Sequence, residues 1–272
     1  MRSQSSRPGL RAAAVFCAAV AVAGTAPAGA AAPAATVSRL PAPAPAAPSP
    51  DPFDGLTPAQ IADRGVDATR SADSLRMTGQ VVSGGQDLDV DFSVDDQGSC
   101  RGRIGVDDGE AELRRVDGVT YMKGDEAFWR ISMTSQGVPE NQIAPVVELV
   151  QGRWLKIAPG QAGSADLDEV CDLDSLLDDL GRGGDDRAGL TRGPDREVDH
   201  TPVATLVKKE SGETTTVSVA QEGKPYIRQV VRTGGDEPGS MTLSAYDRPV
   251  EVTAPPADET VDLSRLDPGT RA

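Results

Sequence analysis

The sequence predicts an α+β fold in which an antiparallel sheet is covered on one face by a few helices. Three features support this class: segments of strictly alternating polarity, tight-turn residues between those segments, and helical segments that come in groups. Strands joined by tight turns pair antiparallel, and helices grouped between two runs of strands pack on one face of the sheet. We expect about eleven strands and three helices, in the order helix, strands, helices, strands.

Residues 1–30 have the composition of a secretory signal peptide. Three arginines precede an apolar run at residues 12–24, and small residues at 28–30 suit a signal peptidase. The apolar run is too short to cross a bilayer as a helix. Cys17 follows Phe16 rather than the small residue that a lipid-modified cysteine requires, so we expect it to be removed with the signal peptide. The mature protein is therefore predicted to be secreted or associated with the cell envelope.

The rest of the chain divides into a linker, a domain and a tail. Residues 31–50 are mostly Ala and Pro, which predicts an extended, semi-rigid linker. We expect residues 51–263 to form one folded domain and residues 264–272 to form a flexible tail. The whole chain carries a formal charge of -15 at pH 7. A surface this acidic favours solubility and repels nucleic acid, so nucleic acid is not an expected partner.

The first element of the domain is a helix that begins at Pro58. Thr57 is a suitable N-cap because its hydroxyl can accept a hydrogen bond from a free N–H of the first turn, where proline is also favoured. We expect this helix to end near Ser74, where helical spacing gives way to alternation.

A run of antiparallel strands follows the first helix. Apolar and polar residues alternate from residue 88 to residue 94, so one face of this strand is apolar and the other is wet. Turns that contain Gly and Asp separate about six expected strands, at residues 75–82, 88–94, 100–106, 110–116, 119–123 and 127–131.

Helical segments then interrupt the strands. Four aliphatic residues from Ile143 to Val150 recur at helical spacing, and a short strand with Trp154 follows. Residues 166–169 have the pattern of a capping box, and an apolar leucine stripe begins at Leu173. The last third of the chain returns to alternating segments, which predict strands at residues 198–208, 214–220, 225–232, 241–246 and 250–253.

Two cysteines remain after removal of the signal peptide, Cys100 and Cys171. An even pair of cysteines in an exported protein is more often bridged than free. We predict a disulfide that joins the strand region to a later helix, and its chain-entropy contribution is about 4 kcal/mol at most.

The sequence contains no recognised catalytic motif. His200 is the only histidine, which excludes a zinc site built on several histidines and leaves one candidate for a Ser-His-Asp arrangement. Its position between Asp199 and Thr201 favours a surface turn. No nucleophile elbow, phosphate-binding loop or dinucleotide motif occurs.

Acidic residues are numerous between Asp166 and Asp179, which suggests calcium as one possibility. A calcium loop needs oxygen ligands at alternate positions, and Val170 and Leu176 interrupt both possible registers. Whether two of the acidic residues form a pair suited to glycoside hydrolysis is left open, because spacing in the sequence does not fix the distance between two carboxylates in the fold. We expect a protein that is not an enzyme and has no metal and no cofactor.

The apolar faces of the strands and helices can enclose a cavity. For each of these apolar residues, the alternative to lining a cavity is a place in an ordinary packed core. The expected helices, however, are few and short for so wide a sheet. Helices that leave part of the sheet uncovered create a pocket for acyl chains. The candidate lining residues are Val90, Phe92, Val94, Ile104, Met122, Trp129, Val146, Val150, Trp154, Leu173, Leu176 and Leu177.

Three short segments give the chain a family resemblance. Residues 116–124 read Val-Asp-Gly-Val-Thr-Tyr-Met-Lys-Gly and precede Trp129, residues 152–154 read Gly-Arg-Trp, and residues 223–227 read Gly-Lys-Pro-Tyr-Ile. In this order, among these strands and helices, they resemble actinobacterial secreted proteins of the LppX/LprG type, within the wider LolA-like lipid-carrier group. The resemblance extends from about Thr57 to Leu263. The absence of a convincing lipid-attachment motif is a departure from that family.

The resemblance implies a half-barrel of antiparallel strands around a hydrophobic cavity, with helices as its lid. It implies that the chain binds or carries lipids or lipidated molecules at the cell envelope without enzymatic activity. Similar proteins include sensors that bind anti-sigma factors. The alternative function is therefore that of an envelope sensor or interaction module of the same fold, whose partner is a protein such as an envelope membrane protein.

Overall fold

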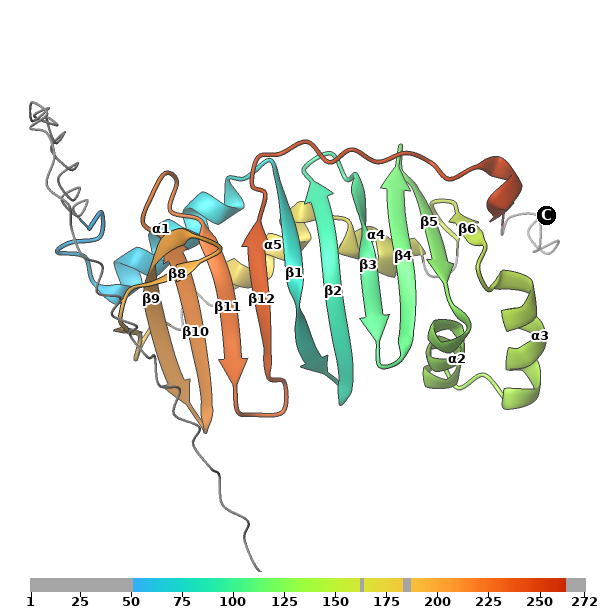
Figure 1. Cartoon of the computed structure of the whole chain (residues 1–272), viewed down its shortest axis with the longest axis horizontal. Coiled ribbons are helices and arrows are strands. Elements are labelled where there is room, and N and C mark those ends of the chain that lie inside the picture. Colours follow the sequence, from blue (N-terminus) through green and yellow to red (C-terminus); the bar gives the residue numbers. More distant parts are fainter. Residues whose placement is uncertain (1–50, 162–163, 183–186, 263–272) are drawn as a thin grey trace, which may run out of the picture. The chain divides into compact units, whose positions relative to one another are not determined.

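One open sheet forms the framework of the domain (Figure 1). The structure is a computed structural model that describes residues 51–161, 164–182 and 187–262, without the side chains of residues 165–166 and 178–182. The predicted signal peptide with Cys17, the linker and the C-terminal tail lie outside the described residues, and they stay predictions.

Thirteen strands are hydrogen-bonded in this sheet within the described residues. Their order is β13-β6-β5-β4-β3-β2-β1-β12-β11-β10-β9-β7, and β8 also pairs with β9. The paired strands are antiparallel except β13, which runs parallel to β6. The strands are β1 Ser74–Ser83, β2 Gln86–Asp95, β3 Cys100–Val106, β4 Gly109–Val116, β5 Val119–Gly124, β6 Trp154–Ile157, β7 Thr191–Arg192, β8 Arg196–Val198, β9 Thr201–Glu210, β10 Glu213–Ala220, β11 Ile227–Thr233, β12 Gly239–Ser244 and β13 Thr260–Asp262.

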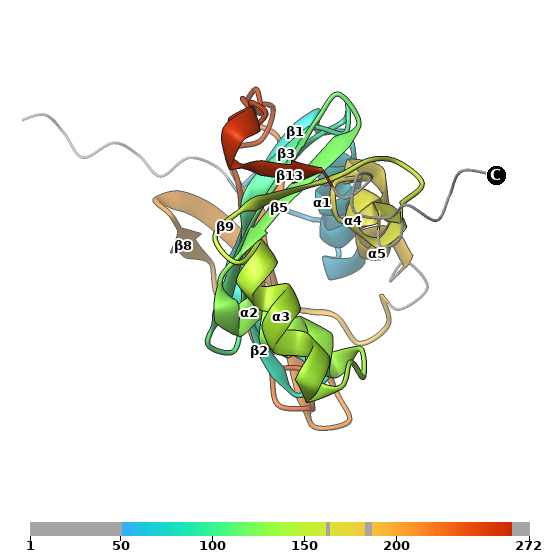
Figure 2. The same cartoon turned by 90° about the vertical axis from the view of Figure 1, so that its right-hand side faces the viewer.

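The helices lie on one face of the sheet and at one end of it. Helices α1, α4 and α5 lie against the same face, which we call the inner face, while α2 and α3 form a hairpin beside β4 and β5 (Figure 2). The opposite face is the outer face. The helices are α1 Pro58–Arg70, α2 Glu126–Ser135, α3 Glu140–Val150, α4 Ser164–Val170 and α5 Leu173–Arg182, with a short 3-10 helix at Ala257–Glu259.

These elements confirm the predicted class of an open, mostly antiparallel sheet with helices on one face. The predicted N-cap of α1 is present: the Thr57 side chain accepts a hydrogen bond from the Gln60 N–H, and the Gln60 side chain accepts one from the Thr57 N–H. This reciprocal pair is a capping box, which satisfies two donors at the start of the helix. The helix ends at Arg70, earlier than expected.

The strand predicted at residues 127–131 is wrong, because these residues lie in α2. Asp125 is the N-cap of that helix, and its carboxylate accepts the Phe128 N–H at 2.7 Å. The periodicity of a short apolar run does not distinguish a strand from a helix. Here the N-cap hydrogen bond of Asp125 favours the helix. Gly124 then allows α2 to approach β5, since a Cβ there would lie 2.9 Å from the Trp129 ring.

The strand predicted at residues 250–253 is also wrong. Residues 245–256, which we call the crossing segment, run from β12 across the ends of the strands toward β13 (Figure 1). Pro249, Pro255 and Pro256 interrupt this segment and have no N–H to donate to a strand ladder. The short strands β7, β8 and β13 were not predicted, and the helical stretch expected after residue 166 is divided into α4 and α5.

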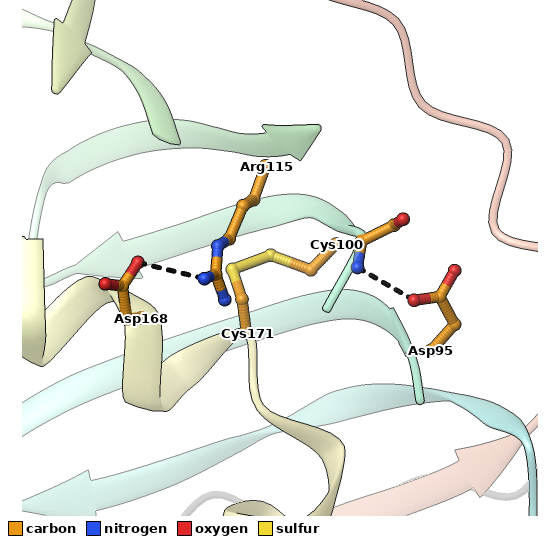
Figure 3. Close-up of a disulfide and its surroundings, with 6 residues drawn as sticks. Asp95, Cys100, Arg115, Asp168 and Cys171 are labelled. Atoms are coloured by element: carbon orange, nitrogen blue, oxygen red, sulfur yellow. Dashed lines mark hydrogen bonds and ion pairs between the residues drawn. A yellow bond between two sulfur atoms is a disulfide. The ribbon is translucent and has the colours of Figure 1, made fainter. Parts of the chain in front are cut away.

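The main core lies between α5 and the inner face. Phe92 and Val94 on β2 and Leu173 and Leu177 on α5 are nearly inaccessible to solvent and belong to one packed cluster. The predicted disulfide between Cys100 and Cys171 is present in the same cluster, where it joins the first residue of β3 to the junction of α4 and α5 (Figure 3). The bridge therefore fixes these two helices over the sheet.

Candidate ligand-binding groove

An apolar row crosses the inner face from β3 to β9. The register pairs Ile104 with Val90, Val90 with Gly79 and Gly79 with Met241. It continues from Met241 through Val230 and Val217 to Leu206. Because residues two apart share a face, the alternating segments of both halves of the chain combine into one apolar floor.

Beside α5, part of this floor is open to solvent as a groove of about 330 Å³. Leu176 and Leu177 form its helical wall, and side chains of β1, β11 and β12 form its floor. The lining residues are Met77, Val81, Val82, Ser83, Leu176, Leu177, Val230, Arg232, Glu237, Gly239, Met241 and Leu243.

A second hollow of about 310 Å³ continues the first one along the sheet, between α1 and β9–β11. Val230 and Arg232 line both hollows, so we treat them as one inner groove. The second part has more charge at its rim, and its lining residues are Ala62, Val66, Arg187, Leu190, Leu206, Lys208, Glu210, Glu213, Thr215, Val217, Ile227, Val230 and Arg232.

Arg232 is the distinctive polar side chain of the inner groove. It is exposed at the place where the two hollows meet, and its guanidinium makes no ion pair with any residue that the structure describes. The other cations of the rim have partners: Arg187 lies 3.1 Å from Asp63, and Lys208 lies 2.8 Å from Glu210. A guanidinium that no described residue neutralises suits an anionic group of a ligand.

Eight of the predicted lining residues lie on the inner face, in three groups. Phe92, Val94 and Leu173 are packed in the core, as the packed-core alternative requires, while Leu176 and Leu177 line the groove. Three further residues are half-buried against the core on the same face, without lining the groove: Val90, Ile104 and Met122.

The other four predicted lining residues lie away from the groove. Trp129 lies on α2 and donates its indole N–H to the Gly124 carbonyl at 3.1 Å. Val146 is 41% exposed on α3, and Val150 is buried on the same helix. The helical spacing predicted for Val146 and Val150 is confirmed, but α2 and α3 pack beside the sheet rather than over the groove (Figure 2).

Trp154 lies on the outer face, so its assignment to the cavity is corrected. Its neighbour Leu155 pairs with Met122 on the inner face, and a difference of one residue along a strand reverses the direction of the side chain. The Trp154 ring is buried under the guanidinium of Arg114, whose carbon lies 4.4 Å from the ring centroid. This is cation–π geometry.

Sequence reasoning did not select Met77, Val81, Val230, Arg232 or Met241. Each of them alternates correctly within a predicted strand, so the local signal was present. Their assembly depends on the pairing of β1 with β12, two strands that are separated by most of the chain. Sequence periodicity carries no information about such pairing.

Metal and histidine chemistry find no support among the described residues. No group of three or more His, Cys, Asp or Glu side chains in this part of the chain could hold a metal ion. His200 is exposed in a turn with a positive φ of 62°, as the sequence predicted for a surface turn. A search of the described residues finds no helix long and apolar enough to cross a membrane.

Solved structures share this arrangement of strands and helices. The crystal structure of LprF from Mycobacterium bovis matches with a TM-score of 0.50 and 14% sequence identity, over 73% of this chain and 96% of that one. The chain has the fold of LprF. The expected LppX/LprG-type fold is thereby confirmed.

Two weaker structural matches were also found. The crystal structure of the Mycobacterium tuberculosis lipoprotein LppX matches with a TM-score of 0.44 and 14% identity, over 72% of this chain and 98% of that one. The structure of MucB in complex with MucA matches with a TM-score of 0.31 and 13% identity, over 79% of this chain and 60% of that one. No protein-family model and no curated protein matches the sequence.

Proposed function

We propose that the protein is a non-enzymatic, extracytoplasmic lipid-binding protein that holds the acyl chain of an amphiphile in the inner groove. The observation that carries the proposal is the open apolar floor between α1, α5 and β9–β12, with the Arg232 guanidinium, which has no ion-pair partner among the described residues, at its centre. The shared fold and the LppX/LprG resemblance support the same function, and the predicted signal peptide supports the location.

The size of the groove suits an acyl chain. Each of its two parts has a volume at the lower end of the range for small-ligand pockets, which is about 300–1,000 Å³. Burial of each methylene contributes about 0.8 kcal/mol, so a chain of about ten methylenes gains roughly 8 kcal/mol before the costs of association. In the proposed arrangement, apolar contact therefore supplies most of the favourable free energy of binding.

Arg232 gives the ligand a direction. In the proposed arrangement the acyl chain lies over Val230 and Met241, and the carboxylate or phosphate of the headgroup meets the Arg232 guanidinium. A neutral headgroup would lose this contact and keep the apolar one. The proposal therefore distinguishes an anionic amphiphile from its uncharged ester.

Binding of a dansyl-labelled fatty acid to the purified protein tests the proposal by fluorescence. Val230→Glu places a carboxylate on the groove floor and is expected to weaken binding by at least about tenfold, because a charge would lie beside the acyl chain and would compete with the headgroup for Arg232. Val231→Glu is the matched control, because Val231 is the next residue on β11 and points to the outer face. Similar losses in both variants, or no binding by the native protein, would refute the proposal.

A second comparison tests the headgroup. Arg232→Gln is expected to weaken binding of the fatty acid several-fold and to leave binding of its methyl ester unchanged. Native mass spectrometry of protein purified from its own host then identifies a retained acyl ligand. If Arg232→Gln weakens both probes equally, the residue contributes packing rather than recognition of charge.

A further inference from the structure

The outer face carries a second and larger groove, with a volume of about 790 Å³. Strands β1–β4 form its floor, and the crossing segment forms its wall. Its charge is opposite to that of the whole chain: five arginines and three carboxylates line it, in a protein of net charge -15. The charged lining residues are Arg76, Arg101, Arg103, Arg114, Arg248, Asp91, Glu112 and Glu251.

Three of these arginines form a row across four neighbouring strands. Arg76 on β1 pairs in register with Ser93 on β2, Ser93 pairs with Arg101 on β3, and Arg101 pairs with Arg114 on β4. Like charges directly opposite one another on adjacent strands destabilise a sheet. An anion between the Arg101 and Arg114 guanidinium groups would relieve this repulsion. Within the protein, Arg114 has the Glu112 carboxylate at 3.7 Å and the Trp154 ring beneath it.

The carboxylates on the floor neutralise only part of this charge. Arg76 donates to both oxygens of Asp91 at 2.8 Å and thereby holds the pKa of Asp91 below its usual range. Arg103 is left with only a long contact of 3.9 Å to the same Asp91 carboxylate. Arg101 and Arg248 have no ion pair among the described residues.

The wall of the groove offers unpaired backbone. Residues 250–254 form no backbone hydrogen bond with any described residue, and they run as an extended trace across the strand ends (Figure 1). A free extended edge is the surface to which another peptide adds by backbone hydrogen bonding. A peptide beside this segment would run across the strands, parallel to the arginine row.

The crossing segment is fixed at its start, which gives the groove a defined wall. Asp247 accepts hydrogen bonds from the Tyr226 hydroxyl at 2.6 Å, from the Lys224 ammonium at 3.1 Å and from the Asp73 N–H at 3.1 Å. The Tyr226 ring stacks on Tyr246 at 3.9 Å. At the other end, β13 pairs with β6.

We propose that the outer groove binds an extended acidic peptide segment of a partner protein, between the crossing segment and the arginine row. Strands lie about 4.8 Å apart, so the row from Arg76 to Arg114 spans about 14 Å. Residues two apart on an extended peptide are about 6.8 Å apart and face the same side, so alternate carboxylates can meet this row. Nucleic acid is a poorer occupant, because the acidic remainder of the surface repels a long polyanion.

Fluorescence anisotropy with a fluorescein-labelled peptide of about eight residues, in which Glu and Val alternate, tests this site. Arg101→Glu with Arg114→Glu is expected to weaken binding at least about tenfold, and added salt should weaken binding to the native protein. Arg64→Glu with Arg153→Glu is the control, since it changes net charge equally at two exposed sites outside the groove. Equal losses in both double variants would overturn the site.

Two competitors separate a peptide site from a simple anion site. The same peptide with Gln in place of Glu should bind at least about tenfold more weakly. A peptide with N-methylated backbone should also bind more weakly, because it cannot donate to the crossing segment. If tripolyphosphate displaces the probe as well as the acidic peptide does, and N-methylation has no effect, the groove binds small anions and the proposal is wrong. Val230→Glu should leave peptide binding unchanged, which separates this site from the lipid groove.

Discussion

Replacement of both Cys100 and Cys171 by alanine tests how the helices are held over the inner face. The two sulfurs are inaccessible to solvent, and the bridge joins residues that are 71 apart in the sequence (Figure 3). Alanine keeps the site apolar, so the main loss is the cross-link itself. For a loop of about 70 residues, the chain-entropy relation gives a stabilisation of about 4 kcal/mol at 25 °C.

This loss should be visible both globally and locally. In a domain of this size each kcal/mol changes the melting temperature by roughly 2–4 °C, so we expect a decrease of roughly 8–16 °C. The α4–α5 region should lose most protection against hydrogen exchange. Without the bridge, the Arg115–Asp168 ion pair at 3.4 Å is one of the few polar links from α4 to the sheet, and partly exposed pairs contribute little (Figure 3).

Urea unfolding, thermal unfolding and hydrogen exchange measure these effects, with the reduced native protein as a control for the alanine substitutions. The reduced protein and the double variant should agree in stability. A loss below about 1 kcal/mol, with unchanged exchange in α4 and α5, would refute the reasoning that the bridge fixes these helices. Non-reducing peptide mapping of secreted protein should first show the Cys100–Cys171 linkage.

Three further substitutions give graded expectations, each measured by urea unfolding. The hydrogen bond from Tyr226 holds the pKa of Asp247 below its ordinary value. The ionised Asp247 therefore stabilises the folded state at neutral pH, and this contribution is lost as pH falls below about 4. Asp247→Asn should remove this part of the acid dependence of stability. Thr57→Ala should lower the free energy of unfolding by about 1 kcal/mol, whereas Thr57→Ser should retain the cap. Leu177→Ala should cost about 2–5 kcal/mol because the side chain is 3% exposed, while Leu149→Ala, at 46% exposed, should stay within about 0.5 kcal/mol.

The features that could be predicted from sequence are those set by neighbours along the chain. The Thr57 cap depends on residues within one turn of it. The alternation from residue 88 to residue 94 depends on the strand repeat of two, so the inner and outer sides of β2 were assigned correctly. The disulfide needed only the number of cysteines and the predicted export of the chain. None of these inferences requires knowledge of distant contacts.

The features that could not be predicted depend on contacts between distant parts of the chain. The inner groove exists because β1 pairs with β12, and no local pattern records that pairing. Trp154 was placed on the wrong face because a strand of four residues is too short to fix its own register. The residues at 127–131 were assigned to a strand because the capping role of Asp125 resembled a turn.

The same alternation separates the two proposed sites. On β1, Met77 lines the inner groove and its neighbour Arg76 lines the outer one, and on β2 the buried Phe92 alternates with Asp91. Adjacent residues thus serve opposite faces of one sheet, and the backbone between them is held by strand pairing on both sides. A substitution at one position should therefore change one binding activity with little effect on the other. Loss of both activities from a single conservative change would point to a shift of strand register, because a shift of one residue exchanges the apolar and charged faces.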